Sequence, residues 1–327
     1  MIFVDSRWNG KHGIGRFSTE VTSRLTVETR PLLSNIRPSS PTDVLTPARL
    51  LLKPSDLVYS PAYNCGPTRA RQILTIHDLI HLDDESQSSK AKSIYYERLV
   101  KPTVRRAGVV LTVSEASRQR IIRWLDDSSV DVRVVGNGSS AAFSPVSTPD
   151  AFAAPRFLYV GNLRSHKNVP VVLDALRQRP AYRLTMVVPD EAEAAALAAA
   201  HGVAAQVDVR SGLDDTELAL AYSGAVATVL PSLQEGFGFP ALESVLCGTP
   251  VLYWSGCASV AEISNGSGLG VAEASDPQEW SNAMDQAVSN RASMLLADPG
   301  FWRDKYDWQK VASAVDQVLS SYEFDRK

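Results

Sequence analysis

The sequence has few cysteines and no long apolar run, and each shortage excludes a class of protein. Its three cysteines, Cys65, Cys247 and Cys257, are scattered and odd in number, which argues against a disulfide framework and for a reducing compartment. No apolar run approaches the roughly 18 residues of a membrane-spanning helix. The N-terminal stretch MIFVDSRWNG lacks the basic and then apolar segments of a signal peptide. We therefore expect a cytoplasmic protein that is either soluble or peripheral at the inner face of the membrane.

Sequence patterns that mark bound cofactors are also missing. No Asp-x-Asp pair occurs anywhere in the chain, and nothing marks a lysine as an attachment site for pyridoxal phosphate. Internal repeats and low-complexity tracts are absent as well. We expect neither a bound metal nor an organic cofactor.

The charge is small overall but uneven along the chain. The formal net charge is −3 over 327 residues, so the molecule as a whole does not have the composition of a polyanion-binding protein. Residues 1–150 contain 20 Lys and Arg against 15 Asp and Glu, whereas residues 151–327 contain 13 against 21. This length and this asymmetry predict two domains with different surfaces and partners.

Short apolar runs alternate with helical-period stretches almost from end to end, which predicts a doubly wound parallel α/β sheet, or two of them. The expected strands are 2–5, 56–60, 72–76, 109–113, 132–135, 156–160, 183–188, 225–230 and 250–254. The expected helices are 14–25, 90–106, 115–125, 168–178, 191–200, 215–222, 240–247 and 276–297. A segment rich in Pro, Ser and Ala at 144–155 is the expected boundary, and an amphipathic helix at 307–319 follows the second sheet.

The segment PSLQEGFGFPALESVLCGTPV, residues 231–251, carries the most specific chemistry. Ligands of open α/β sheets bind beyond the carboxyl ends of the strands, and this segment follows an expected strand. Gly236 and Gly238 allow backbone to approach a ligand, and the helix that starts near Pro240 offers N–H groups to an anion. Glu243 is placed to accept hydrogen bonds from a ribose, and Glu235 to reach the opposite end of the ligand. The pattern predicts a site for a nucleotide-diphosphate sugar.

Two other loops contribute suitable groups. The loop GNLRSHKN, residues 161–168, follows an expected strand and would project Arg164 and Lys167 toward the same anion. Gly13 and Gly15 lie at the start of the helix after the first strand, where they indicate either a ligand-binding loop or only a tight turn.

The segment 231–251 resembles the Glu-x7-Glu signature of retaining glycosyltransferases of family 4, which have the GT-B fold. Similar segments run through the chain in the family's order: GIGRF (13–17), TIHDL (75–79), VSEASRQRI (113–121), GNGSSAAFSP (136–145) and FLYVGNLRSHKN (157–168). The resemblance implies two Rossmann-like doubly wound parallel-sheet domains that face each other across a cleft. Residues 1–148 would form the acceptor-side domain and 149–306 the donor domain. The C-terminal helix, 307–327, would cross back to the first domain.

The resemblance also assigns roles to residues. His77 would bond the transferred sugar, Arg164 and Lys167 would hold the leaving diphosphate, and Glu235 would hold the sugar. Leu213 and Asp215 would contact the nucleobase, although Asp215 is equally well interpreted as the N-cap of an ordinary helix. The expected catalytic residues are His77, Arg164, Lys167 and Glu235. The expected donor-binding residues are Gly13, Gly15, Arg164, Lys167, Leu213, Asp215, Glu235, Gly236, Phe237, Gly238, Phe239 and Glu243.

The expected activity is metal-independent transfer of a hexose from a GDP- or UDP-linked donor, with mannose from GDP-mannose as the first choice. A nucleotide-sugar epimerase of the same fold and a non-catalytic sugar-nucleotide-binding protein are the alternatives. The acceptor stays open between a glycan, a lipid-linked glycan and a small molecule. Residues 90–106 are rich in Lys and Arg with interleaved apolar residues, which is typical either of a helix that contacts anionic lipid or of an ordinary solvated helix.

Overall fold

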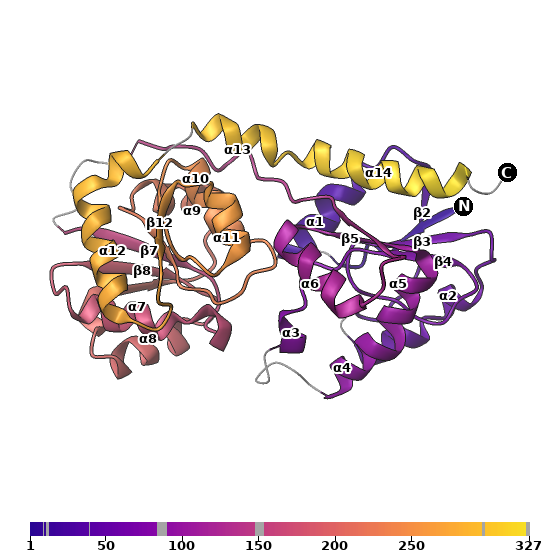
Figure 1. The fold of residues 1–327 in the computed structure, drawn as a ribbon, viewed down its shortest axis with the longest axis horizontal. Coiled ribbons are helices and arrows are strands. Elements are labelled where there is room, and N and C mark those ends of the chain that lie inside the picture. Colours follow the sequence, from indigo (N-terminus) through magenta and orange to yellow (C-terminus); the bar gives the residue numbers. More distant parts are fainter. Residues whose placement is uncertain are drawn as a thin grey trace. The chain divides into compact units, whose positions relative to one another are not determined.

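The structure is a computed structural model in which the chain forms two compact units (Figure 1). It describes residues 1–8, 10, 13–38, 40–83, 90–147, 154–295 and 298–324. Unit 1 comprises Met1–Gly138 and Tyr306–Lys327, and unit 2 comprises Ser139–Lys305. The division thus falls at Gly138, whereas the boundary expected between residues 148 and 149 lies outside the described residues.

Unit 1 contains a parallel sheet with the strand order β2-β1-β3-β4, next to the parallel pair β5-β6. A parallel bridge between Thr75 and Leu111 connects the two sheets. The strands are β1 (Ile2–Val4), β2 (Thr29–Pro31), β3 (Leu57–Ser60), β4 (Arg71–Leu74), β5 (Val109–Thr112) and β6 (Asp131–Val134).

Helices cover the sheets of unit 1, and one of them comes from the C-terminal part of the chain. They are α1 (Gly13–Thr22), α2 (Pro47–Leu50), α3 (Ile80–Asp83), α4 (Lys90–Tyr95), α5 (Lys101–Ala107), α6 (Glu115–Leu125) and α14 (Trp308–Phe324). Helix α14 packs along α1, and Asp316 accepts hydrogen bonds from the backbone N–H and the hydroxyl of Thr26, both at 2.8 Å. The expected return of the C-terminal helix to the first domain is therefore confirmed.

Unit 2 contains a six-stranded parallel sheet with the strand order β12-β11-β10-β7-β8-β9. Its strands are β7 (Arg156–Val160), β8 (Arg183–Val187), β9 (Val207–Arg210), β10 (Thr228–Leu230), β11 (Val251–Trp254) and β12 (Gly268–Val271). The chain runs outward from β7 to β9 and then returns to the other side of β7 with β10. The topological switch point of the sheet therefore lies between β7 and β10.

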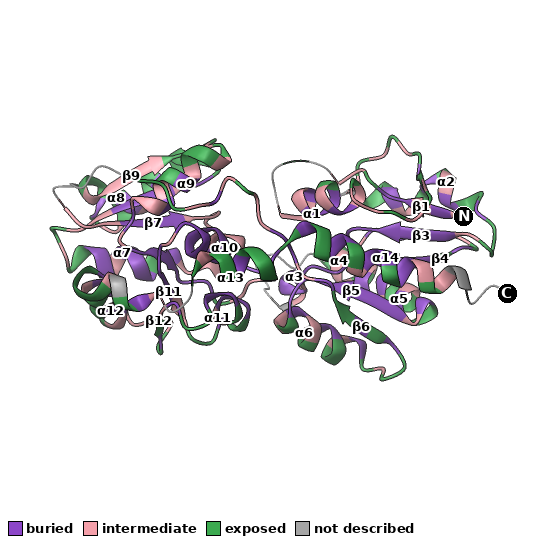
Figure 2. Ribbon diagram, turned by 90° about the horizontal axis from the view of Figure 1, so that it is seen from above, coloured by how far each residue is buried: buried purple, intermediate pink, exposed green. Residues whose placement is uncertain are grey.

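The helices of unit 2 bury an apolar core against this sheet. They are α7 (Val169–Arg177), α8 (Glu191–Ala200), α9 (Asp215–Ser223), α10 (Phe239–Leu246), α11 (Ala258–Ser264), α12 (Pro277–Asn290) and α13 (Pro299–Lys305). One cluster joins buried residues of α7, α8 and α12 with strands β7 and β8, and Figure 2 shows β7 as buried. Among the described residues, no helix is long and apolar enough to cross a membrane.

Two expected helices differ in detail from the observed ones. The helix expected over 276–297 ends at Asn290 and continues as a 3₁₀ turn at Arg291–Met294. The helix expected over 90–106 consists of α4, a π-helical segment at Tyr96–Val100 and α5, which ends before Gly108 in the left-handed region at φ 73°. Glycine adopts this conformation without steric cost and ends helices for that reason.

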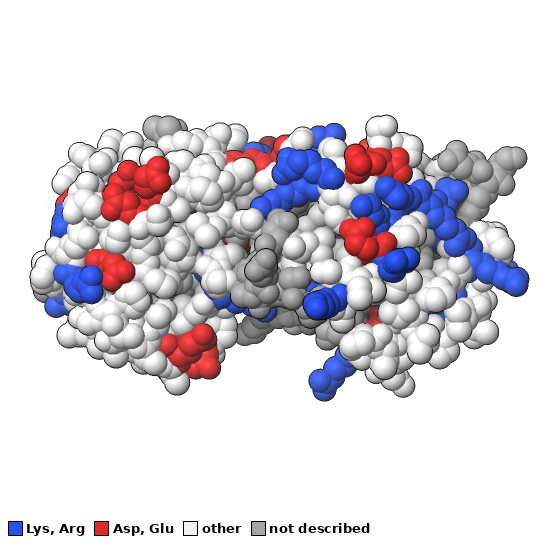
Figure 3. All heavy atoms as spheres, turned by 60° about the horizontal axis from the view of Figure 1, so that its bottom comes forward, with Lys and Arg blue, Asp and Glu red and all other residues white. Residues whose placement is uncertain are grey.

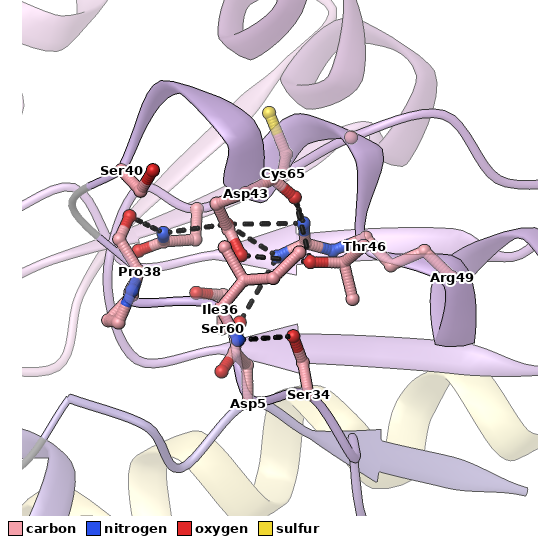
Figure 4. A network of polar contacts seen from close by, with 12 residues as sticks. Asp5, Ser34, Ile36, Pro38, Ser40, Asp43, Thr46, Arg49, Ser60 and Cys65 are labelled. Atoms are coloured by element: carbon pink, nitrogen blue, oxygen red, sulfur yellow. Dashed lines mark hydrogen bonds and ion pairs between the residues drawn. The ribbon is translucent and has the colours of Figure 1, made fainter.

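A buried ionic network lies at the carboxyl end of β1 (Figure 4). Arg7 contacts Asp5 at 2.5 Å and Asp43 at 2.6 Å, and Arg49 contacts the same two carboxylates at 3.1 and 3.2 Å. Asp5 and Arg49 are both 0% exposed. Two cations thus balance two anions, which is the condition under which charges are tolerated in a protein interior.

The network connects several loops of unit 1. Arg7 also donates to the Ile36 carbonyl at 2.7 Å, and the amide of Asn64 donates to Asp43 at 3.0 Å. Burial tends to raise the pKa of Asp43, but hydrogen bonds from Arg7 and Asn64 and the charge of Arg49 outweigh it, so the pKa is lowered from 3.8. Because the pKa of Asp43 is lowered by folding, its ionised carboxylate stabilises the fold at pH values above the ordinary pKa of 3.8. This stabilisation is lost as the pH falls through the lower pKa of the folded state.

We predict that Asp43→Asn destabilises the protein by about 3–5 kcal/mol, because it leaves the fully buried Arg49 and the partly exposed Arg7 with one carboxylate. The matched control is Asp208→Asn, which removes an exposed ion pair with Arg210 at 2.8 Å and is expected to cost less than about 1 kcal/mol. Urea unfolding of both variants measures the difference. Equal losses in the two variants would show that the buried network does not stabilise unit 1.

Candidate active site

The loops that follow β7 and β10 are neighbours because these strands pair in parallel, with Thr228 beside Leu158. The loop after β7 spans residues 161–168, and the loop after β10 spans residues 231–238. The backbone N–H of Leu233 donates to the carbonyl of His166 at 2.7 Å and joins the two loops directly. The structure therefore brings together, at the switch point of unit 2, the two segments in which the sequence predicts a donor site.

The loop 161–168 has a compact local structure. The backbone N–H of Arg164 donates to the Asn162 side chain at 3.2 Å, and a 3₁₀ turn follows at Ser165–Lys167. Asn168 is left-handed at φ 51°, a conformation that asparagine tolerates, and its amide donates to the Ala274 carbonyl at 2.8 Å. Arg164 is exposed on this loop, whereas Lys167 is only partly exposed.

Lys167 and Glu235 form an ion pair between the two loops. The ammonium nitrogen lies 2.6 Å from Glu235 Oε1, and the side chains are 13% and 12% exposed. The hydroxyl of Ser232 donates to the same carboxylate oxygen at 2.8 Å. Burial, and then the charge of Glu235, raises the pKa of the Cys257 thiol to about 11. Both side chains are therefore shielded from most of the solvent without being completely buried.

Helix α10 begins beside this pair. Gly238 precedes its first residue and is left-handed at φ 106°, where a Cβ would also approach Val260 Cγ2 to 3.3 Å. The first N–H groups of a helix have no intrahelical partner and attract anions. Phe237 is buried and packs edge-on against Phe239 with ring centroids 5.1 Å apart. Gly236 has no side chain, and the side chain of Phe237 is buried. We therefore expect these two donor residues to contact a ligand through their backbone groups.

Glu243 lies inside α10 and is 6% exposed. The hydroxyl of Tyr222, a fully buried residue of α9, donates to Glu243 Oε2 at 2.9 Å. Burial, and then the charge of Glu243, raises the pKa of the nearby Cys247 thiol to about 12. Sequence reasoning missed Tyr222, since nothing in its helical segment distinguishes it from an ordinary core residue.

The interpretation of Asp215 as an N-cap is wrong by one residue. The N-cap of α9 is Asp214, whose carboxylate accepts from the N–H groups of Thr216 and Glu217, both at 2.9 Å. Glu217 returns a bond to the Asp214 N–H, which completes a capping box. Leu213 and Asp215 follow β9, the edge strand, and Asp215 is the first residue of α9, which packs against α10.

The other expected site residues lie in unit 1. Gly13 is the first residue of α1, and Gly15 is buried in its first turn. His77 follows β4 and is 9% exposed; its Nε2 lies 2.9 Å from the Pro61 carbonyl. Phe17 of α1 packs edge-on against the His77 ring with centroids 4.8 Å apart. Unit 1 therefore brings the glycine-rich start of α1 and His77 together.

Comparison with known proteins finds one family model that matches most of unit 2. Residues 152–298, most of unit 2, match the family model of the Glycosyl transferases group 1. Over 235 residues the chain is 29% identical to a glycogen synthase of Mycobacterium tuberculosis, which covers 66% of this chain and 54% of the relative. It is 26% identical over 267 residues to the O-antigen chain mannosyltransferase B of Escherichia coli, covering 75% and 64%. The chain thus matches between half and two thirds of the length of these relatives.

The fold agrees with a solved structure over the whole chain. The structure of Anabaena Alr3699/HepE in complex with UDP-glucose superposes with a TM-score of 0.75 and 15% identity, covering 98% of this chain and 99% of that one. At this identity the likeness concerns the fold alone. The chain has the GT-B fold of two Rossmann-like domains with parallel sheets, as the sequence predicts.

If Glu243 binds a ribose, as the sequence predicts, Tyr222→Phe should weaken binding of UDP or GDP about threefold to tenfold. The change removes the hydroxyl that donates to the Glu243 carboxylate and holds it in position. Tyr182→Phe is the matched control, since Tyr182 also donates to a carboxylate of unit 2, Asp285, at 2.8 Å. Calorimetric titration compares the two variants with the unchanged protein. If both lose affinity equally, or neither does, Tyr222 does not orient a nucleotide ligand.

Proposed function

We propose that the chain is a retaining glycosyltransferase that moves a hexose from a nucleotide-diphosphate sugar to an acceptor hydroxyl. The observation that carries this proposal is the switch point of unit 2, where Lys167, Glu235 and the N-terminus of α10 meet. A cation and a helix N-terminus suit a diphosphate, and a carboxylate beside them suits sugar hydroxyls. The family match of residues 152–298 supports the same conclusion.

In the proposed reaction the protein supplies position and charge rather than a nucleophile. The bond between the anomeric carbon and the diphosphate oxygen breaks, and the acceptor oxygen bonds to the same face of that carbon. The acceptor proton passes to the leaving diphosphate. Arg164 and Lys167 stabilise the charge that grows on the diphosphate, and Glu235 holds the sugar in its reactive pose. The role of His77 at the sugar rests on the family resemblance.

The first choice of donor is GDP-mannose, and bacterial glycan or glycoconjugate synthesis is the proposed setting. The Escherichia coli relative is a mannosyltransferase, which supports mannose. Alr3699/HepE has been solved with UDP-glucose, which keeps UDP-linked donors in competition. Thermal-shift screening of GDP, UDP, GDP-mannose and UDP-glucose tests the donor, and stabilisation by none of them would contradict the proposal.

Transfer is favoured over the two alternatives. The family model and the mannosyltransferase relative both carry transfer in their descriptions. The epimerase alternative would release free nucleotide without any acceptor, and a non-catalytic binding protein would leave the donor intact. Measuring free nucleoside diphosphate with and without a glycan acceptor separates the three. We also propose that no metal is needed, so turnover should persist in EDTA.

We predict that Arg164→Ala and Lys167→Ala lower kcat by about 10²–10³-fold while raising the donor KM much less, because their charge partner grows as the diphosphate departs. The control is Arg177→Ala, an exposed cation of α7 paired only weakly with Asp174 at 3.3 Å, which should leave both constants unchanged. Steady-state kinetics measure the effect. A rise in KM with unchanged kcat would show that the two cations only bind the donor.

Peripheral contact with an anionic membrane is a second proposal, and it concerns unit 1 alone. Figure 3 shows several Lys and Arg side chains on the face of unit 1 that carries α4 and α5. Some basic residues of the segment 90–106 bond to other residues of unit 1: Lys101 pairs with Glu97 at 3.4 Å, and Arg106 donates to the Arg69 carbonyl at 2.6 Å. Lys90, Ile94 and Arg98 are exposed instead, Ile94 by 61%.

We predict that the double change Lys90→Glu and Arg98→Glu abolishes binding to vesicles containing anionic lipid, because both cations face solvent and can contact the lipid headgroups. Salt should weaken binding of the unchanged protein, because it screens the same charges. Arg177→Glu, which reverses an exposed cation of unit 2, is the control. Co-sedimentation at low and high salt measures binding. If the unchanged protein does not sediment with anionic vesicles at low salt, the segment is an ordinary solvated helix.

A further inference from the structure

Lys167 and Glu235 neutralise each other in the structure, although the proposed function assigns them to different parts of the donor. Lys167 belongs at the diphosphate and Glu235 at the sugar. Their charged atoms are only 2.6 Å apart, and both side chains are nearly nine-tenths shielded. Within the described part of the chain, Glu235 is the only carboxylate in an ion pair with Lys167. The two charges of the pair therefore balance each other, and Arg164 is exposed on the same loop as Lys167.

A nucleoside diphosphate that arrives without a sugar disturbs this balance. If Lys167 turns to the diphosphate, Glu235 keeps the hydroxyl of Ser232 but loses the one cation that pairs with it among the described residues. A shielded carboxylate that loses a charged partner is strongly disfavoured. If Lys167 stays with Glu235, the diphosphate instead lies beside a carboxylate and a neutralised lysine. Either arrangement weakens the binding of the bare diphosphate.

An intact donor removes the conflict. Its sugar hydroxyls donate to Glu235 in place of the ammonium group, so Lys167 is released to the diphosphate while every charged group keeps a partner. During this change the hydroxyl of Ser259 holds the backbone carbonyl of Glu235, at 3.0 Å, and the hydroxyl of Ser232 stays bonded to its carboxylate.

We propose that the Lys167–Glu235 pair is an exchange device that makes the site prefer the intact donor to the nucleoside diphosphate left after transfer. The proposal rests on the proposed function and deepens it. When the sugar moves to the acceptor, Glu235 loses the hydroxyl donors and takes Lys167 back. The hold on the remaining diphosphate weakens at that moment, which favours product release. Glu235 is then a specificity-determining residue as well as a sugar ligand.

The exchange predicts opposite effects for two changes at the same carboxylate. Glu235→Gln removes the competing anion, so Lys167 is available to a bare diphosphate, and UDP or GDP should bind about tenfold tighter, equivalent to about 1.4 kcal/mol. The donor should gain nothing, since it already frees Lys167. Ser232→Ala removes the second donor to Glu235 Oε1, which increases the need for Lys167, so the bare diphosphate should bind about twofold to threefold more weakly.

Calorimetric titration with UDP, GDP, UDP-glucose and GDP-mannose, without acceptor, measures these affinities for the unchanged protein and both variants. Asp208→Asn removes a carboxylate on the surface of unit 2 and is the control, because it should change no affinity. Thermal unfolding establishes that each variant is folded. If Glu235→Gln does not fold, the Ser232→Ala result decides the matter alone.

The outcomes separate failure of the exchange from failure of the proposed function. Tighter binding of the bare diphosphate in Glu235→Gln, with no gain for the donor, supports the exchange. Equal gains for both ligands would show a general effect of charge removal and overturn it. An unchanged or lower affinity for the bare diphosphate would also overturn it and leave the transferase proposal standing. If the unchanged protein binds none of the four ligands, the proposed function itself fails.

Discussion

The parallel pairing of β10 with β7 is the constraint on which the candidate site depends. The chain leaves β7, builds β8 and β9 on one side, and returns to the other side of β7. Only this order brings the loop after β7 beside the loop after β10, with Leu233 bonded to His166 and Glu235 bonded to Lys167. The residues come from positions far apart in the sequence, and the sheet supplies their proximity.

The two units use charged groups in different ways. In unit 1, Asp5 and Arg49 are completely buried and Asp43 is 3% exposed, whereas Arg7, the second cation of the network, is 12% exposed. Such a network fixes loops and offers nothing to a ligand. In unit 2, Lys167 and Glu235 are shielded but remain 13% and 12% exposed, so a ligand can replace one partner with another. The carboxylates of the structural network are thus more deeply buried than the carboxylate of the binding pair.

The sequence predicts much of this fold because apolar periodicity reports burial directly. It does not reveal β2, β9 and β12. Strand β2 is short, lies at the edge of its sheet and contains Pro31, whereas β12 contains Gly268 and Gly270. Gly268 is needed because a Cβ there would lie 2.0 Å from the Val251 carbonyl oxygen, so packing against β11 selects a residue with low strand propensity.

The individual loops of the site are also predictable, since glycines, a proline and paired charges follow apolar strands. The contacts between loops are not. Periodicity cannot show that Lys167 reaches Glu235, or that Tyr222 on α9 reaches Glu243 on α10, because these contacts depend on strand order and helix packing. The shift of the α9 N-cap from Asp215 to Asp214 has a similar origin, since both residues suit the position and only the backbone geometry selects one.

Hydrogen exchange measured with and without UDP or GDP tests the central claim most directly, because it reports where a nucleoside diphosphate contacts unit 2. If the switch point is the donor site, bound diphosphate should slow exchange in peptides covering residues 161–168 and 238–243, while the edge strand β12 and helix α12 stay unchanged. Binding that protects other segments and leaves the loop 161–168 and the start of α10 unaffected would contradict the account.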